Sequence, residues 1–220
     1  MPGERLRQIA ALVRPGRVVA DIGTDHAYLP VALVKSGRCP RAVACDLREG
    51  PLENARRSVA EAGLADRIAC RLGNGFSPVA EGEAEEIVVA GMGGETIASI
   101  LEACPYLHDP RYHLLLQPMT RPEELRRFLM THGFSIESET VTEEPPHLYT
   151  VLSVYYTGCA PETDETRFYR GALCGETGRR FLERQIRALR KKYEGLAAGG
   201  GPAGEREQLA RLIAALEETV

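Results

Sequence analysis

The sequence of 220 residues contains no apolar run long enough to cross a membrane. A spanning helix needs about 20 consecutive apolar residues, and no segment approaches that length. The first residues also lack the basic and then apolar layout of a secretory signal peptide. These absences argue against a membrane or secreted protein, and we expect a cytoplasmic one.

The cysteines form no C-x-x-C pair, and no histidine stands at metal-ligand spacing from them. Disulfides are rare in the cytosol, so we expect free thiols and no metal. The formal net charge of −4 argues against a uniformly basic chain, although an average can hide a local basic patch. The six cysteines are Cys39, Cys45, Cys70, Cys104, Cys159 and Cys174.

Short apolar runs alternate with amphipathic patterns over the first 156 residues, and no internal repeat interrupts them. Helical spacing marks residues 6–13, 52–62, 95–103 and 122–132. Strands that alternate with helices form a mostly parallel sheet with helices on both faces. The runs that we predict as strands are Val18–Ile22, Ala42–Cys45, Ile68–Leu72, Ile87–Ala90, Leu114–Leu116, Phe134–Val141 and Leu148–Tyr156.

The last two predicted strands are separated only by residues 143–147, which is too short for a helical crossover. They should therefore pair as an antiparallel hairpin. The predicted fold class is α/β, with a Rossmann-like sheet that is parallel except for this terminal hairpin. That arrangement is typical of the class I methyltransferase sheet.

Beyond about residue 158 the strand pattern stops and two amphipathic helices follow, separated by the helix-breaking run 198–202. We predict a first domain over residues 1–158 and a second over 159–220, in which the two helices form an antiparallel hairpin. The apolar stripes that should face each other are Leu182, Ile186, Leu189 and Tyr193 on one helix, and Leu209, Ile213, Leu216 and Val220 on the other.

A glycine turn follows the first predicted strand, at Asp21-Ile22-Gly23-Thr24-Asp25. Gly23 lets a ligand approach the backbone closely, as in nucleotide-binding folds. An ordinary corner between strand and helix is the alternative. The second strand ends in Asp46, about 20 residues further on, where such folds place the carboxylate that accepts hydrogen bonds from a ribose.

The glycine turn is acidic and does not read G-x-G-x-x-G, because Thr24-Asp25-His26 follows Gly23. A carboxylate at this place would repel the pyrophosphate of a dinucleotide. S-adenosylmethionine carries an ammonium and a sulfonium and no phosphate, so the turn favours this cofactor over NAD or ATP.

Two more glycine-rich segments follow predicted strands. In residues 72–76, Asn74 could hydrogen-bond the edge of a cofactor adenine while Phe76 covers its face, although a plain turn is an equal alternative. Gly91-Met92-Gly93-Gly94 should form a turn that leaves room for two ligands to meet.

Three segments together resemble the bacterial tRNA (adenine-22-N1)-methyltransferase family: Asp21-Ile22-Gly23-Thr24-Asp25-His26-Ala27-Tyr28-Leu29-Pro30, Gly91-Met92-Gly93-Gly94 and Leu115-Leu116-Gln117-Pro118. The resemblance covers residues 5–156, and the ten-residue first segment is its most specific part. The sequence departs from the family pattern at Asn74, where Asp is usual, and at Met119, where Asn is usual.

The resemblance implies a class I methyltransferase domain with a helical C-terminal domain, S-adenosylmethionine as cofactor, and one adenine in the D-arm region of tRNA as substrate. It places Asp21, Ile22, Gly23, Asp46, Leu47, Asn74, Gly75, Gly91 and Met92 in the cofactor site. It places Asp25, His26, Tyr28, Gln117 and Pro118 near the methyl group and the target base.

The N1 atom of adenine carries an in-plane lone pair and needs no base to remove a proton, so catalysis reduces to alignment. The sequence also lacks the N/D-P-P-Y tetrad of enzymes that methylate an exocyclic amine. We expect Asp25 and His26 to orient cofactor and base, Tyr28 to stack on the adenine, and the Gln117 amide to bind its edge. Helix capping by His26 and packing of Tyr28 under the loop are the alternatives.

A basic helical face in the second domain predicts contact with tRNA. The residues are Arg180, Arg184, Arg187, Lys191 and Lys192, with Arg5, Arg7, Arg126 and Arg127 as weaker candidates. A solvated helix face is the alternative explanation.

Two other functions stay open. A methyltransferase of a small molecule or protein could use the helical tail as a lid, and a non-catalytic RNA-binding protein could keep the same fold. A nicotinamide oxidoreductase is disfavoured by the acidic turn. We expect a monomer.

Overall fold

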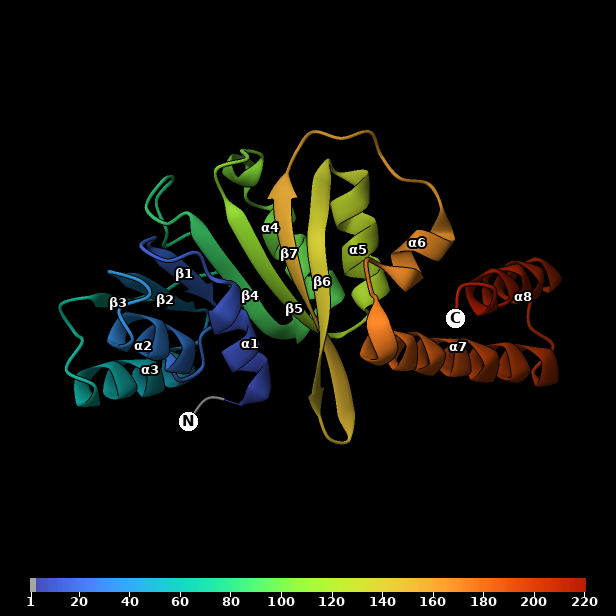
Figure 1. The fold of residues 1–220 in the computed structure, drawn as a ribbon, viewed down its shortest axis with the longest axis horizontal. Coiled ribbons are helices and arrows are strands. Elements are labelled where there is room, and N and C mark those ends of the chain that lie inside the picture. Colours follow the sequence, from blue (N-terminus) through green and yellow to red (C-terminus); the bar gives the residue numbers. More distant parts are fainter. Residues whose placement is uncertain (1–2) are drawn as a thin grey trace.

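The computed structural model describes residues 3–220 and contains a single sheet of seven strands in the order β3-β2-β1-β4-β5-β7-β6 (Figure 1). Strands β1 to β5 are parallel, and β7 runs antiparallel to both β5 and β6. This confirms the predicted parallel sheet with a terminal hairpin. The strands are β1 Val19–Ile22, β2 Ala42–Asp46, β3 Ile68–Leu72, β4 Glu86–Gly93, β5 His113–Thr120, β6 Phe134–Glu144 and β7 His147–Tyr156.

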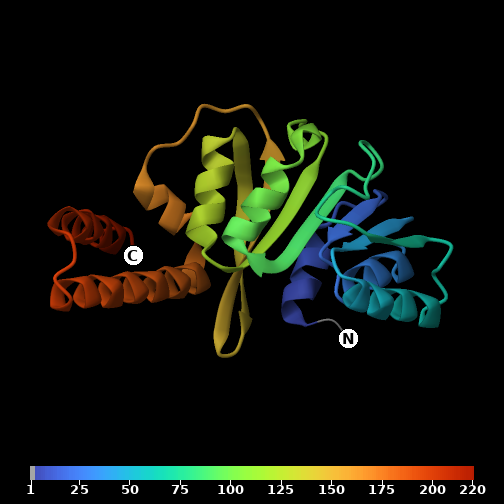
Figure 2. The ribbon, with the colours of Figure 1, turned by 180° about the vertical axis from the view of Figure 1, so that it is seen from behind.

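Helices cover both faces of the sheet, as Figures 1 and 2 show from opposite sides. On one face, α1 (Glu4–Leu12), α2 (Tyr28–Lys35) and α3 (Glu49–Glu61) pack on a cluster that includes residues of β1, β2 and β4. On the other, α4 (Gly94–Glu102) and α5 (Pro122–Thr131) cover a second cluster. Strands buried on both faces explain the nearly continuous apolar runs.

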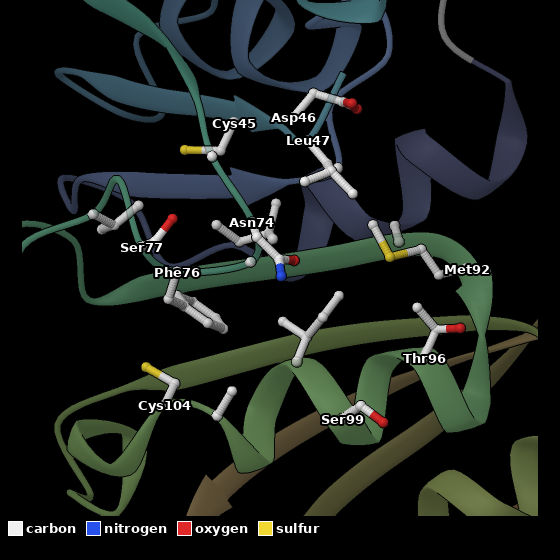
Figure 3. Close-up of a pocket in the computed structure, with 18 of the residues that line it drawn as sticks. Cys45, Asp46, Leu47, Asn74, Phe76, Ser77, Met92, Thr96, Ser99 and Cys104 are labelled. Carbon is white, nitrogen blue, oxygen red and sulfur yellow. The ribbon is translucent and has the colours of Figure 1, made fainter. Parts of the chain in front are cut away.

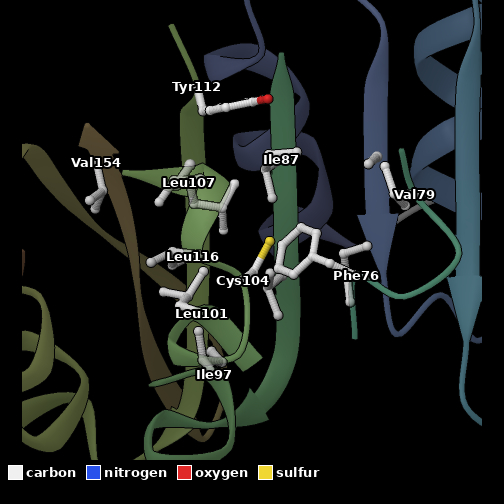
Figure 4. Close-up of a cluster of buried hydrophobic side chains, with 14 of the residues drawn as sticks. Phe76, Val79, Ile87, Ile97, Leu101, Cys104, Leu107, Tyr112, Leu116 and Val154 are labelled. Carbon is white, nitrogen blue, oxygen red and sulfur yellow. The ribbon is translucent and has the colours of Figure 1, made fainter. Parts of the chain in front are cut away.

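The second cluster forms the main core under α4 (Figure 4). Ile97 and Leu101 of α4 pack there with Leu116 of β5, and a short 3-10 helix (Pro105–Leu107) closes one end with Leu107. The spacing of Ile97 and Leu101 puts both side chains on one helical face. No helix among residues 3–220 is long and apolar enough to span a membrane.

The segment Gly91–Gly94 differs from the predicted turn. It continues β4 through Gly93, and α4 begins directly at Gly94. The pairing of β4 with β5 shifts here, from Ala90 opposite Gln117 to Met92 opposite Pro118. Gly91 is therefore the extra residue of a β-bulge, and the sequence prediction missed it because bulges depend on the partner strand.

The tail contains the two predicted helices, α7 (Gly175–Ala198) and α8 (Ala203–Glu217), and a shorter helix α6 (Glu165–Arg170) that the sequence analysis missed. The predicted stripes of α7 and α8 face each other, while Val220 lies outside this contact and is 41% exposed. Residues that form the buried contact are Leu182, Ile186, Leu189, Leu209, Ile213 and Leu216, with Tyr193 packed against them.

A buried ion pair joins the tail to the sheet. Arg126 of α5 and Glu139 of β6 are both fully buried, with Nη2 and Oε1 2.6 Å apart. Arg126 Nη1 also donates to the carbonyls of Phe168 and Tyr169 at 2.9 Å, and the Ala172 amide donates to Glu139 Oε2. Arg126 is thus no candidate for RNA contact, and it anchors α6 instead.

We expect Arg126→Ala to lower the free energy of unfolding by about 3–5 kcal/mol, because removal of one partner leaves Glu139 as an uncompensated buried charge. Denaturant unfolding measures this difference. The control is Arg167→Ala, which breaks the exposed pair with Glu162 and should change stability by less than about 1 kcal/mol. Equal effects of the two substitutions would contradict the anchoring role.

Candidate functional site

A cavity of about 1060 Å³ opens where the carboxyl ends of β1, β2 and β4 meet (Figure 3). The strand order reverses between β1 and β4, and open α/β sheets bind ligands at this kind of switch point. Of the nine residues predicted to hold a cofactor, eight line the cavity: Ile22, Gly23, Asp46, Leu47, Asn74, Gly75, Gly91 and Met92.

The Gly23 turn is pinned to the end of β2, because the amides of Gly23 and Thr24 both donate to the Cys45 carbonyl at 2.8 Å. Gly23 has φ +81°, and a Cβ there would lie 1.9 Å from Met92 Cε. The left-handed backbone favours glycine, and Met92 Cε, at the end of a flexible side chain, fills the space that a Cβ would take. The turn therefore depends on having no side chain.

Asp46 ends β2 at the wall of the cavity. Its Oδ1 accepts a hydrogen bond from the Arg48 amide at 2.8 Å. No other hydrogen bond to this carboxylate is present among residues 3–220, which leaves Oδ2 for a ligand. Leu47 follows, 63% exposed, at the mouth of the cavity. A carboxylate with one oxygen fixed and one open is suited to accept a hydrogen bond from a ligand hydroxyl.

Asp21 is the one predicted cofactor residue outside the cavity lining, and it lies 8% exposed in β1. Burial raises the pKa of Asp21 from 3.8 to about 6, and the negative charge of Asp46 adds to this rise. The carboxyl group thus stays protonated in the folded protein up to mildly acidic pH.

Helix α4 supplies a wall that the sequence analysis did not predict. Thr96 and Ser99 face the cavity from successive turns of the helix (Figure 3), and Ile100 also lines it. The inner end is formed by Phe76 with Cys45 and Cys104. A stripe such as Thr96, Ser99 and Ile100 has no local signal, because only the packing of α4 against the sheet exposes it to the cavity.

Asp25, His26 and Tyr28 follow the glycine turn, and His26 and Tyr28 are not among the residues that line the cavity. Asp25 lines the cavity, and its Oδ2 lies 3.4 Å from His26 Nε2. The rings of His26 and Tyr28 are parallel within 8°, with centroids 5.0 Å apart. Tyr28 is 52% exposed, so it is not packed under the loop. An exposed flat ring beside the cavity is suited to stack on another planar group.

Gln117 and Pro118 lie near the end of β5, behind the Gly91 bulge. Gln117 is fully buried. Its Oε1 accepts from the amide of Gly91 at 3.1 Å, and its Nε2 donates to the Pro118 carbonyl at 2.8 Å. Binding the edge of a base, as the sequence predicts, would require this amide to release these partners.

The five basic residues predicted for RNA differ in their surroundings. Arg180 pairs with Glu143 at 2.8 Å, and Arg184 donates to the Pro146 carbonyl, so both hold the tip of the β6–β7 hairpin. Lys192 pairs with Glu205 of α8. Within residues 3–220, Arg187 and Lys191 have no ion-pair partner, and both are exposed.

No group of three or more metal-binding side chains occurs among the described residues, and each of the six cysteines is a free thiol. The lining of the cavity contains carboxylates, hydroxyls and glycine-rich backbone. Its charged lining residues are Asp25, Asp46 and Arg48.

Comparison with known proteins agrees with this geometry. Residues 3–152 match the model of a methyltransferase domain family, and they carry the whole cavity. The chain belongs to this methyltransferase family. Its sheet, with helices on both faces and a terminal antiparallel hairpin, is the class I methyltransferase fold.

Known relatives carry more specific names. The methyltransferase is 38% identical over 149 residues to the tRNA (adenine(22)-N(1))-methyltransferase of Bacillus subtilis, and this match spans 68% of the chain and 63% of the relative's length. The crystal structure of the Bacillus subtilis m1A22 tRNA methyltransferase superposes with TM-score 0.84 at 28% identity, covering 99% and 98% of the two chains. A Mycoplasma capricolum structure with bound S-adenosylhomocysteine superposes with TM-score 0.83 at 25% identity, covering 100% and 97%.

Asp21→Asn should stabilise the ligand-free methyltransferase at pH 7. The unfolded chain loses the Asp21 proton near 3.8 but the folded protein keeps it to about 6, so stability falls as pH rises between these values. Asp21→Asn should raise the free energy of unfolding by at most about 3 kcal/mol at pH 7, because a pKa difference of one corresponds to about 1.4 kcal/mol. Unfolding curves from pH 4 to 8 measure it, with Asp25→Asn in the exposed part of the turn as control. If the free energy of unfolding depends on pH in the same way for wild type and Asp21→Asn, this prediction is wrong.

Proposed function

We propose that this protein transfers a methyl group from S-adenosylmethionine to N1 of adenine 22 in tRNA, in the cytoplasm. The cavity at the switch point carries this proposal, with its glycine turn and the carboxylates Asp25 and Asp46. The exposed ring of Tyr28 stacks on His26, which lies next to Asp25. The names of the relatives from Bacillus subtilis and Mycoplasma capricolum support it.

The cavity fits this cofactor in size and chemistry. Its volume of about 1060 Å³ is slightly above the range of roughly 300–1,000 Å³ that is typical of ligand pockets. Asp46 would accept hydrogen bonds from the ribose, with Asn74 and Phe76 at the adenine. The Gly23 turn and Asp25 would hold the cationic methionyl end, where a carboxylate favours a positive charge.

When bound, S-adenosylmethionine supplies an electrophilic methyl group on a positively charged sulfur. The N1 lone pair of the adenine forms the new C–N bond, and the electron pair of the broken C–S bond stays on sulfur. No proton leaves, so no general base is needed. Tyr28 would hold the ring, Asp25 with His26 would orient it, and the Asp25 carboxylate would offset the positive charge that the base gains.

The carboxyl edge of the sheet continues into the hairpin and the tail helices. The β6–β7 hairpin projects from this edge, and α7 leads away from it (Figure 1). We propose that residues 159–220 form an RNA-binding domain in which Arg187 and Lys191 contact phosphates. Arg180, Arg184 and Lys192 would stabilise this surface through their contacts with Glu143, the Pro146 carbonyl and Glu205. The N1 atom lies on the Watson–Crick edge, so a paired target must be exposed first.

Incubation with transfer RNA and labelled cofactor, followed by mass spectrometry of the nucleosides, tests the proposal. We expect one 1-methyladenosine per molecule of substrate tRNA, at position 22. Gly23→Ala is the control with reduced activity, because alanine strains the left-handed backbone of the turn at φ +81°. A label on N6, at another position, or on no tRNA would refute the proposal.

Replacement of Arg187 and Lys191 by glutamine should weaken tRNA binding and flatten its salt dependence. Each lost phosphate contact reduces the slope of log affinity against log salt by about 0.7–0.9. Filter binding at several salt concentrations gives the slope. The control is Arg211→Gln, a cation of α8 already paired with Glu207. If the slope of log affinity against log salt is unchanged, Arg187 and Lys191 do not contact phosphates, and the basic face of α7 is only a solvated surface.

Tyr28→Ala should lower turnover by about 5- to 150-fold, because stacking of a base on an aromatic ring is worth roughly 1–3 kcal/mol. Tyr28→Phe keeps the ring and should retain most of the activity. Single-turnover methylation of tRNA measures both, with circular dichroism to verify folding. If Tyr28→Ala turns over at the wild-type rate, the stacking role is wrong.

A further inference from the structure

The bulge at Gly91 leaves one backbone amide without a partner in the sheet ladder. Ala90 pairs opposite Gln117 and Met92 opposite Pro118, so Gly91 stands between two paired residues. It has φ +80°. Its amide donates to the side-chain Oε1 of Gln117 at 3.1 Å. The side chain of the opposite strand thus replaces the missing ladder bond.

The bulge determines where Met92 lies. Met92 lines the cavity, and its Cε occupies the space that Gly23 leaves open (Figure 3). Bulges next to active sites commonly re-aim a side chain in this way. A shift of the Gly91 backbone would therefore move Met92 relative to the glycine turn at which the methyl group is expected.

Gln117 can hold the bulge in only one orientation of its amide. Its Nε2 donates to the Pro118 carbonyl at 2.8 Å. A half-turn of the amide would place Nε2 against the Gly91 N–H and Oε1 against the Pro118 oxygen, which are two repulsive contacts. Because Gln117 is fully buried, water cannot relieve them.

Arg5 of α1 supplies the charged contact to this amide. Its Nη1 donates to Gln117 Oε1 at 2.7 Å and contacts Met119 Sδ at 2.9 Å. Gln117 Oε1 therefore receives two donors, from Arg5 and from Gly91. A hydrogen bond from a charged donor is stronger than a neutral one, so Arg5 contributes most to fixing the amide.

The β6–β7 hairpin holds Arg5 in turn. The Arg5 amide donates to Glu144 Oε1 at 2.9 Å, and Arg5 Nε lies 4.0 Å from Glu144 Oε2. The guanidinium also lies over the ring of Tyr149, 5.5 Å from its centroid. Helix α1 lies beside this hairpin in Figures 1 and 2. A continuous set of contacts thus runs from the hairpin through Arg5 and Gln117 to Gly91.

We propose that Arg5 is a positioning residue for methyl transfer, which sets the Gly91 bulge through Gln117 and connects it to the β6–β7 hairpin. The inference rests on the proposed function, because that function supplies the reaction whose geometry Arg5 would set. The contacts of Arg5 with Gln117 and Glu144 are independent of that function. A phosphate contact by Arg5 is disfavoured, because its side chain is only 22% exposed and Glu144 already compensates its charge.

The first experiment separates positioning from RNA binding by steady-state kinetics on tRNA. Arg5→Ala should lower kcat by about 10- to 100-fold, the range expected for loss of a hydrogen bond from a charged group. The KM for tRNA and its salt dependence should stay as in wild type. Arg5→Lys keeps the charge but not the planar geometry and should recover activity only in part. The control is Arg17→Ala, whose exposed pair with Glu85 lies at the opposite edge of the sheet.

A double substitution tests the order of the contacts. If Arg5 acts through Gln117, the pair Arg5→Ala and Gln117→Ala should have the same kcat as Gln117→Ala alone. Independent roles would make the two losses multiply. An unchanged kcat with a raised KM and a flatter salt dependence would make Arg5 a phosphate contact and overturn the proposal.

The second experiment needs neither cofactor nor tRNA. Amide hydrogen exchange of residues 90–94 should be faster in Arg5→Ala than in wild type and unchanged in Arg17→Ala, with global stability measured in parallel. If the amides of residues 90–94 exchange in Arg5→Ala as they do in wild type, Arg5 does not hold the Gly91 bulge and the proposal is wrong. If wild-type protein makes no 1-methyladenosine, the proposed function fails, and exchange at Gly91 still decides whether Arg5 holds the bulge.

Discussion

The parallel alignment of β1, β2, β4 and β5 is the constraint on which the site depends. It brings four carboxyl ends to one edge of the sheet, and the reversal of strand order between β1 and β4 opens a crevice there. Gly23, Asp46 and Met92 are far apart in the chain, yet each follows or ends one of these strands and so reaches the same cavity.

The terminal hairpin extends this arrangement toward the tail. Because β7 is antiparallel to β5, β6 runs in the direction of β5 and its turn returns to the edge that carries the cavity. Contacts of the hairpin with Arg5 on one side and Arg180 on the other place it between the site and α7. One element can thus serve both the binding surface and the geometry of the Gly91 bulge.

Charge is distributed unevenly between the cavity and the tail helices, and the net charge of −4 conceals this difference. Two carboxylates, Asp25 and Asp46, line the cavity with one arginine, Arg48, whereas the exposed cations Arg187 and Lys191 lie on α7. Several other arginines are used inside the protein. Arg126 joins α6 to β6 in a fully buried pair, which shows how little the presence of an arginine says about contact with RNA.

The sequence by itself determined the strand order along the chain, the glycine turn at Gly23, the carboxylate at Asp46 and the facing stripes of α7 and α8, because each depends on local spacing or local backbone freedom. Only the tertiary structure decided that α4 lines the cavity, that Gly91 is a bulge and that Gln117 is buried. The physical reason is that these features arise from partners distant in the chain, such as Arg5 and Gln117, which are 112 residues apart.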